Sequence, residues 1–167
     1  MTNDPWTTDL DAVFRQYAVY VATIAHRILG SRDELEDVVQ DVFLRAHRSL
    51  RTLRNAEAVA SWLATVTVRV SQRRLRARKL RRWLRLDGPA AYEPADPGAS
   101  PETRAAVGAI FRALEQVPVD ARVAWSLRYL HGEKLERVAA LCGCSLAAAK
   151  RRIARARDVL DEVVGHD

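Results

Sequence analysis

The sequence predicts an all-α fold, with two small helical domains joined by a flexible linker and a helix-turn-helix in the C-terminal domain. Three observations predict it. Apolar residues recur at helical spacing along most of the chain, whereas strand-like alternation is scarce. A stretch rich in Pro, Gly and Ala then interrupts this pattern, and a short helix, a Gly-containing turn and a longer helix follow towards the end. We therefore assign residues 1–86 to the first domain, 87–101 to the linker and 102–167 to the second domain.

The first domain is expected to begin with two helices. The first carries apolar residues at helical spacing from Leu10 onwards and ends at Gly30, a favourable residue just after a helix. The next four residues, Ser31-Arg-Asp-Glu34, have the S-x-x-E form of a capping box, in which the hydroxyl and the carboxylate accept hydrogen bonds from amides at a helix start. The second helix is expected to run from there to about Leu50.

A third helix is expected after Asn55, and it passes without Gly or Pro into a strongly basic run. Nine Lys or Arg and no acidic residue lie between Arg69 and Arg85, while the whole chain has a formal charge of +6 and a pI near 9.9. This balance favours a polyanionic partner such as nucleic acid or, less often, an anionic membrane surface. Trp83 and Leu84 would make only a thin apolar anchor, so we expect no stable membrane insertion.

The linker reads DGPAAYEPADPGASP and lacks both helical periodicity and basic residues. Its composition favours a plain flexible tether over an acidic strand that mimics nucleic acid. Ser100-Pro101-Glu102 then suits a helix start, because Ser caps, Pro fits the first helical position and Glu faces the positive end of the helix dipole.

The second domain ends in a helix-turn-helix pattern around Gly143. On a helical wheel the last helix turns Ile153 inward and a basic, small-residue face outward. Small residues let a helix enter the major groove, where Arg can bind guanine and flanking cations can hold phosphates. A solvated basic face is the alternative, but the turn and the capped helix favour DNA binding through Ser145, Ala147, Ala148, Lys150, Arg151, Arg152 and Arg155.

No enzyme is expected, and no catalytic residue, metal site or cofactor is assigned. The histidines His26, His47, His131 and His166 are scattered, with no nucleophile, phosphate-loop or metal-ligand pattern beside them. The two cysteines are one residue apart, too close for a normal disulfide and too few for structural zinc. The first residues lack a positive leader with an apolar segment, so the protein is expected to be cytoplasmic.

The second helix carries a family resemblance. Its outer face is expected to expose Asp37, Asp41 and Leu44, and an exposed Leu between carboxylates suggests a partner, although a lone exposed Leu is often meaningless. The segment Glu36-Asp-Val-Val-Gln-Asp-Val-Phe-Leu-Arg-Ala-His-Arg48 resembles the polymerase-binding segment of extracytoplasmic-function (ECF) sigma factors. The similarity continues through Trp62-Leu63 and resumes over residues 127–132 and 142–157, so it covers most of the chain.

The resemblance implies a sigma factor that binds core RNA polymerase and directs promoter recognition, strand opening and transcription initiation. Asp37, Gln40, Asp41 and Leu44 would contact the polymerase, and the last helix would bind the minus-thirty-five element of promoter DNA. The family is usually held inactive by an anti-sigma factor, which would cover these faces. The minus-ten element would be bound by the segment after the second helix and by the third helix, through Arg54, Asn55, Trp62, Arg69, Gln72, Arg73 and Arg76.

The sequence departs from the family pattern at two places, and both the role of Trp62 and the overall function have alternatives. Arg69 stands where the family often has Asn, and Ala147-Ala-Ala149 replaces Gly-Thr-Val, so the family's promoter preferences do not transfer. Trp62 shares an apolar stripe with Val59 and Leu63, which favours a core position over a base-stacking one. A helix-turn-helix activator or repressor is the alternative, but it would not need the Glu36–Arg48 segment.

Overall fold

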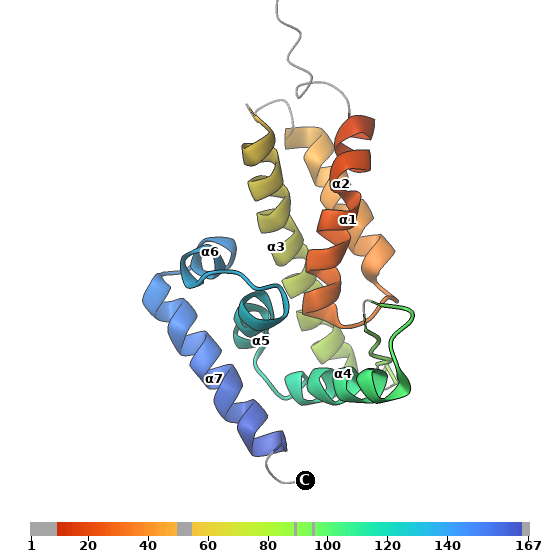
Figure 1. Cartoon of the computed structure of the whole chain (residues 1–167), viewed down its shortest axis with the longest axis vertical. Helices are drawn as coiled ribbons and strands as arrows, with labels where there is room; N and C mark the ends of the chain where they lie inside the picture. Colours follow the sequence, from red (N-terminus) through yellow and green to blue (C-terminus); the bar gives the residue numbers. More distant parts are fainter. Residues whose placement is uncertain (1–9, 50–54, 89, 95, 165–167) are drawn as a thin grey trace, which may run out of the picture.

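The structure is a computed structural model that describes residues 10–49, 55–88, 90–94 and 96–164. Over these residues the chain is helical and has no strand, which confirms the predicted all-α class. None of its helices is long and apolar enough to cross a membrane over the same residues. The first group of helices (Figure 1) consists of α1 (Leu10–Leu29), α2 (Leu35–Ser49) and α3 (Ala56–Trp83). The second consists of α4 (Pro101–Leu114), α5 (Val119–Trp125) with its π-helical extension η2 (Ser126–Leu130), α6 (Leu135–Leu141) and α7 (Leu146–Val164).

Local sequence explains where several helices begin. Asn55 caps α3, since its side-chain oxygen accepts a hydrogen bond of 2.7 Å from the amide of Ala58. Ser100 caps α4 in the same way, accepting from the amide of Thr103 at 3.2 Å, with a proline in the first turn. Both helix starts agree with the sequence prediction.

The predicted capping box at the start of α2 does not form, and this expectation was wrong. The hydroxyl of Ser31 accepts a hydrogen bond from the amide of Asp33, and α2 begins only at Leu35. The carboxylate of Glu34 is held instead by the guanidinium of Arg78 on α3, at 2.6 Å. A charge-assisted bond to a buried Arg is stronger than a bond to a backbone amide, so the long-range partner prevails.

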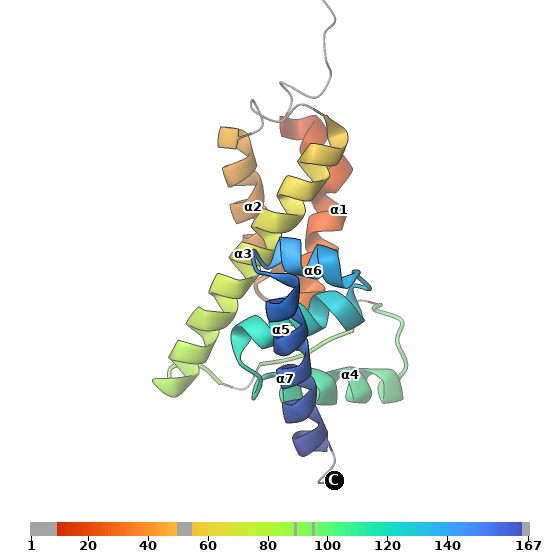
Figure 2. The ribbon, with the colours of Figure 1, turned by 90° about the vertical axis from the view of Figure 1, so that its left-hand side faces the viewer.

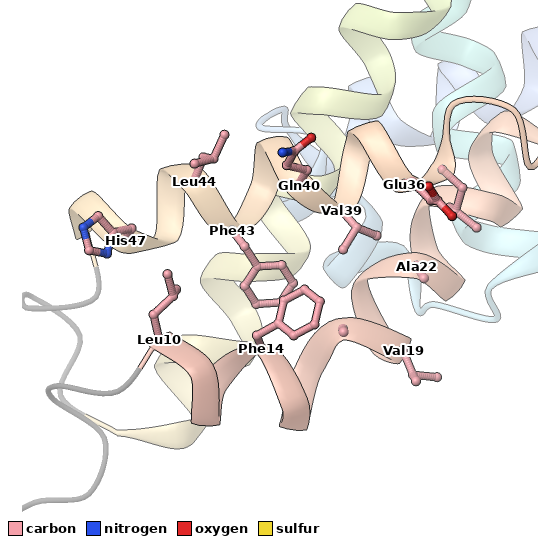
Figure 3. A pocket seen from close by; sticks show the side chains of 12 residues that line it. Leu10, Phe14, Val19, Ala22, Glu36, Val39, Gln40, Phe43, Leu44 and His47 are labelled. Atoms are coloured by element: carbon pink, nitrogen blue, oxygen red, sulfur yellow. The ribbon is translucent and has the colours of Figure 1, made fainter.

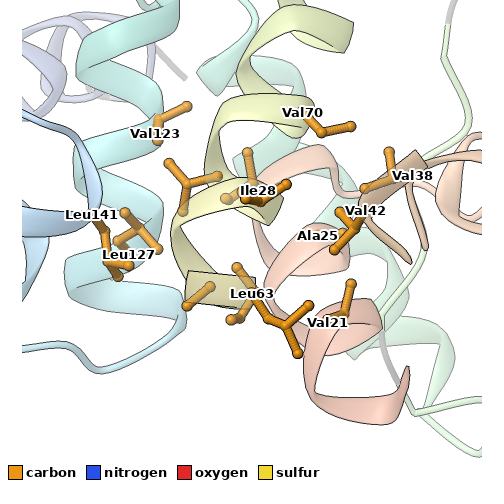
Figure 4. Packing of buried hydrophobic residues seen from close by; sticks show 14 of the residues in the cluster. Val21, Ala25, Ile28, Val38, Val42, Leu63, Val70, Val123, Leu127 and Leu141 are labelled. Atoms are coloured by element: carbon orange, nitrogen blue, oxygen red, sulfur yellow. The ribbon is translucent and has the colours of Figure 1, made fainter. Parts of the chain in front are cut away.

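The two groups of helices share one continuous apolar core (Figure 4). Ile28 and Leu63 of the first group belong to the same cluster of buried side chains as Val123, Leu127 and Leu141 of the second. A smaller cluster lies between α4, α5 and α7. Because α3 packs against α5 and α6, and α1 packs against η2, the second domain is docked on the first.

The described part of the linker also contacts both domains. The amide of Glu93 donates a 3.0 Å hydrogen bond to the carbonyl of Gly30 at the end of α1. The ring of Tyr92 stacks on Phe111 of α4, with centroids 5.4 Å apart. Composition predicted a flexible linker and gave no signal for these contacts.

Candidate functional site

An apolar groove of about 750 Å³ lies between α1 and α2 (Figure 3). Phe14 of α1 meets Phe43 of α2 edge to face at its floor, with ring centroids 4.8 Å apart. Leu44 on the α2 side and Val19 on the α1 side remain 59% and 77% exposed. Large apolar side chains left exposed beside a groove are typical of a protein-binding surface.

Two of the four predicted polymerase contacts, Gln40 and Leu44, line this groove. The sequence reasoning missed the opposite wall, which α1 supplies through Leu10, Phe14, Ala18, Val19 and Ala22. A signal was present, because the apolar residues of α1 extend beyond the single stripe that its core contacts require.

The other two predicted polymerase contacts, Asp37 and Asp41, lie where α2 faces α3. Both carboxylates pair with Arg74 of α3, at 3.4 Å and 3.2 Å, and their side chains remain 62% and 41% exposed. Exposed pairs of this kind contribute little to stability, so both carboxylates stay accessible to a partner. Arg74 thus links the acidic face of α2 to the basic helix α3.

The arginine run on α3 has two roles that its sequence does not separate. Several of its cations are engaged within the fold: Arg78 with Glu34, Arg81 with Glu34 and Asp87, and Arg82 with Glu115 just after α4. The exposed cations of the run are Arg69, Arg73, Arg76, Lys79 and, just after α3, Arg85. These five are available to a negatively charged partner.

Only some of the residues predicted to bind the minus-ten element lie on an exposed basic surface. Arg54 lies outside the described residues. Asn55 is the α3 cap, and Trp62 is half-buried against the shared core, in agreement with the core position that its stripe predicts. Gln72 is half-buried, whereas Arg69, Arg73 and Arg76 form an exposed basic face on α3.

The predicted helix-turn-helix is present. α6 ends at a turn in which Gly143 has a φ of +61°, and Ser145 then caps α7 by accepting a 3.1 Å hydrogen bond from the amide of Ala148. Lys150, Arg151 and Arg155 are exposed on α7. Ala147 is also exposed, so the start of α7 has a small-residue tip followed by cations.

Arg152 differs from its neighbours on α7. Its guanidinium pairs with Asp120 of α5 at 3.2 Å. The two residues line a shallow hollow of about 260 Å³ beside α7, together with Arg151 and Arg155. Arg152 therefore holds α7 on α5, a contact that the helical wheel of α7 alone could not reveal.

The cysteines and histidines form no metal cluster within the described ranges. Burial raises the pKa of Cys142 to about 11, so its thiol is unreactive at neutral pH. Burial lowers the pKa of His26 and of His131, and the nearby Arg32 and Arg27 respectively add to this effect. Both histidines therefore favour the neutral form in the folded chain.

Acidification is expected to destabilise the chain through His26 and His131. Because both have lowered pKa values in the folded state, the unfolded state binds protons more readily, and stability falls as pH drops below the unfolded value near 6.5. Each contributes up to about 1.4 kcal/mol per pH unit. Urea unfolding at pH 7.5 and 5.5 measures this loss. The His26→Gln/His131→Gln double variant should reduce it. A loss in the double variant equal to that of the wild-type chain would contradict the assignment.

Comparison with known proteins agrees with this geometry. Residues 13–81 match the family model of sigma-70 region 2, and residues 108–160 match that of sigma-70 region 4. The chain is 31% identical over 160 residues to the ECF RNA polymerase sigma-E factor of Escherichia coli, which covers 89% of this chain and 83% of the relative. It is also 31% identical over 156 residues to the ECF RNA polymerase sigma factor SigM of Mycobacterium tuberculosis, covering 93% and 77%.

The fold is also similar to solved structures. The sigma factor RpoE in complex with the anti-sigma factor NepR from Bartonella quintana superposes with a TM-score of 0.67 at 24% identity, over 95% of this chain and 98% of that one. CnrH in complex with the cytosolic domain of CnrY gives a TM-score of 0.61 at 23% identity, over 95% and 88%. With two region models in order and relatives matched over most of their length, this chain belongs to the ECF family of RNA polymerase sigma factors, which are non-enzymatic subunits for promoter recognition.

Proposed function

We propose that this chain binds core RNA polymerase through the first domain and contacts promoter DNA through both domains. Residues 1–86 would contact the polymerase and the minus-ten element, 87–101 would connect the domains, and 102–167 would bind the minus-thirty-five element. One observation carries this proposal. The same chain of this family has an apolar groove between α1 and α2 and also a capped basic helix within a helix-turn-helix. A stand-alone helix-turn-helix regulator would not need the groove.

The polymerase would contact Gln40 and Leu44 at the groove and Asp37 and Asp41 beside it. Exposed apolar side chains flanked by carboxylates suit a partner that presents an apolar helix with basic neighbours. The apolar part supplies affinity, while the carboxylates orient the partner and speed its association. Arg74 would restrain both carboxylates in the free chain.

Promoter DNA would meet two basic faces. Arg69, Arg73 and Arg76 on α3 suit the backbone phosphates of the minus-ten element, with Arg54, Asn55, Trp62 and Gln72 nearby in the sequence. On α7, Arg151 and Arg155 suit base edges in the major groove, Ala147 and Ala148 allow close approach, and Ser145 and Lys150 suit phosphates. Arg152 would act through its pairing with Asp120, by keeping α7 in position.

An anti-sigma factor is the second expected partner. One of the two similar solved structures is a complex with NepR, which is an anti-sigma factor, and the other is a complex with the cytosolic domain of CnrY. A segment of such a protein could occupy the groove between α1 and α2 and so exclude the polymerase. The expected location of this chain is the cytoplasm, where the polymerase acts.

Co-elution with sigma-free core polymerase tests the proposal. The purified chain and core should elute together as one complex in size-exclusion chromatography, and the complex should retain a labelled promoter duplex that core alone does not retain. The Asp41→Arg variant should weaken core association, because it replaces a carboxylate that would meet basic residues of the polymerase with a cation that repels them. Failure of the wild-type chain to co-elute with core would overturn the proposed function.

A further inference from the structure

The outer face of α3 changes character along its length. Arg69, Arg73 and Arg76 lie on one stripe, and steps of four and three residues continue this stripe through Leu80 and Trp83. These two apolar side chains are 57% and 79% exposed. A stripe that begins with cations therefore ends in an apolar surface, which the proposed promoter contacts do not use.

A third exposed apolar side chain and three cations surround this end of the helix. Leu84, which follows α3 directly, is 49% exposed and lies one turn after Leu80. In Figure 2 the end of α3 projects away from the other helices. We define the α3 tip by its exposed apolar residues and its exposed cations, which are Leu80, Trp83 and Leu84 with Arg76, Lys79 and Arg85.

The chain reversal after α3 places a cation in a strained backbone conformation. Arg85 has a φ of +57°, and it is the only residue other than glycine with a positive φ in the part of the chain that the structure describes. The amide of Leu86 donates a 2.9 Å hydrogen bond to the carbonyl of Arg81, so Arg85 occupies the position after a helix where glycine is favoured. A side chain retained there in spite of strain suggests a function for its charge.

The other charges near the α3 tip have partners within the fold. Arg81 pairs with Asp87 at 2.6 Å, and Arg82 pairs with Glu115 just after α4. Asp87 is the only acidic residue between positions 76 and 88 of the sequence. Because its carboxylate is already paired with Arg81, the three exposed cations give the tip a positive charge.

An anionic membrane surface matches this chemistry better than duplex DNA does. DNA phosphates would attract the cations, but paired and stacked bases offer little apolar surface to the leucines beside them. Anionic lipids offer both, since their headgroup phosphates attract Lys and Arg while the acyl boundary accepts apolar side chains. Trp favours the level between the two. A projecting tip also suits a bilayer, which needs no preformed cavity to receive it.

We infer that the α3 tip binds reversibly to an anionic membrane surface. Trp83 would lie at the level of the headgroups, with the two leucines at the acyl boundary and the cations on lipid phosphates. This is binding at the surface without stable insertion, and it goes beyond the proposed function. Arg76 belongs both to the tip and to the basic face proposed for the minus-ten element, so a membrane-bound chain has fewer cations available for DNA.

Sedimentation of the full chain with lipid vesicles tests the inference. With vesicles of phosphatidylcholine and about one-third phosphatidylglycerol, half of the wild-type chain should bind at on the order of 0.1 mM accessible lipid. Phosphatidylcholine alone should bind it at least about ten-fold less tightly. Trp83→Ser should weaken binding to the anionic vesicles about ten-fold, because an apolar side chain at the interface is lost. Val19→Ser is the control: it removes a side chain of α1 that is 77% exposed and should not change lipid binding.

Variants of Arg85 separate lipid binding from folding. Arg85→Gly removes a cation and relieves the left-handed conformation, so the variant should unfold at a higher urea concentration than the wild-type chain. It should nevertheless bind anionic vesicles about five-fold less tightly. Arg85→Lys keeps the charge and should retain the binding, as should Arg45→Ala, which removes an exposed cation from α2. A more stable Arg85→Gly with unchanged vesicle binding would contradict the role of the tip.

Other partners predict different outcomes. No binding of the wild-type chain to anionic vesicles, or equal binding to both kinds of vesicle, would overturn the inference. Equal losses in Trp83→Ser and Val19→Ser would also overturn it, because lipid would then not distinguish the tip from α1. If Trp83→Ser and Arg85→Gly weakened binding to a labelled DNA strand or duplex and left vesicle binding intact, the tip would be a DNA contact instead. None of these results bears on core polymerase, which the proposed function places at the groove between α1 and α2.

Discussion

Leu44→Asp is expected to reduce affinity for core polymerase by at least about 30-fold. Leu44 is an exposed wall of the groove between α1 and α2, and its burial by a partner would contribute about 1.5–3 kcal/mol. An aspartate at this position loses this burial energy, and binding must also remove its carboxylate from water. Together these raise the loss of binding free energy above about 2 kcal/mol. Titration of labelled core with each protein measures the change.

Leu86→Asp is the matched control, because Leu86 is also an exposed leucine, at 70%, and does not line the groove. Both substitutions are at exposed positions, so each should change the free energy of unfolding by no more than about 0.5 kcal/mol. Equal losses of core affinity in the two variants would show that the groove is not the polymerase-binding surface.

Arg151→Ala is expected to weaken binding to the duplex promoter element by about 5-fold to 150-fold, which corresponds to the loss of about 1–3 kcal/mol from one base-contacting Arg. Arg151 is exposed on α7 and lines the hollow beside it. Core affinity and the free energy of unfolding should stay unchanged. Fluorescence anisotropy with cognate and scrambled duplexes, in holoenzyme at a fixed salt concentration, measures the effect.

Arg152→Ala provides the contrast on the same helix. Removing Arg152 breaks its ion pair with Asp120 and should lower the free energy of unfolding by up to about 1 kcal/mol. Its effect on DNA should be smaller than that of Arg151→Ala and independent of sequence. If the two variants lost the same sequence-specific binding with no change in stability, the division of roles on α7 would be incorrect.

The sequence predicted several helix starts correctly because these depend on local residues. Asn55, Ser100 and Ser145 cap the helices that they precede, because a cap depends on residues two or three positions away. The capping box at Ser31 failed because Glu34 is bound by Arg78, which is 44 positions later in the chain. A motif of four residues holds no information about such a partner.

The candidate surfaces were predicted only in part for the same reason. The motif on α2 identified Gln40 and Leu44, but the wall that faces them comes from α1 and depends on how the two helices pack. The arginine run indicated one basic face, yet Arg78 and Arg82 hold the fold together. Nothing in the linker's composition indicated that Tyr92 would join the domain interface.

Transcription with sigma-free core polymerase on a library of upstream DNA regions tests the central claim most directly. Addition of the purified chain should produce transcripts that begin at defined positions downstream of a shared pair of sequence elements, and at limiting chain concentration Leu44→Asp should reduce them strongly. No start-site-specific transcript from the wild-type chain, under conditions in which another sigma factor activates the same core, would contradict the account.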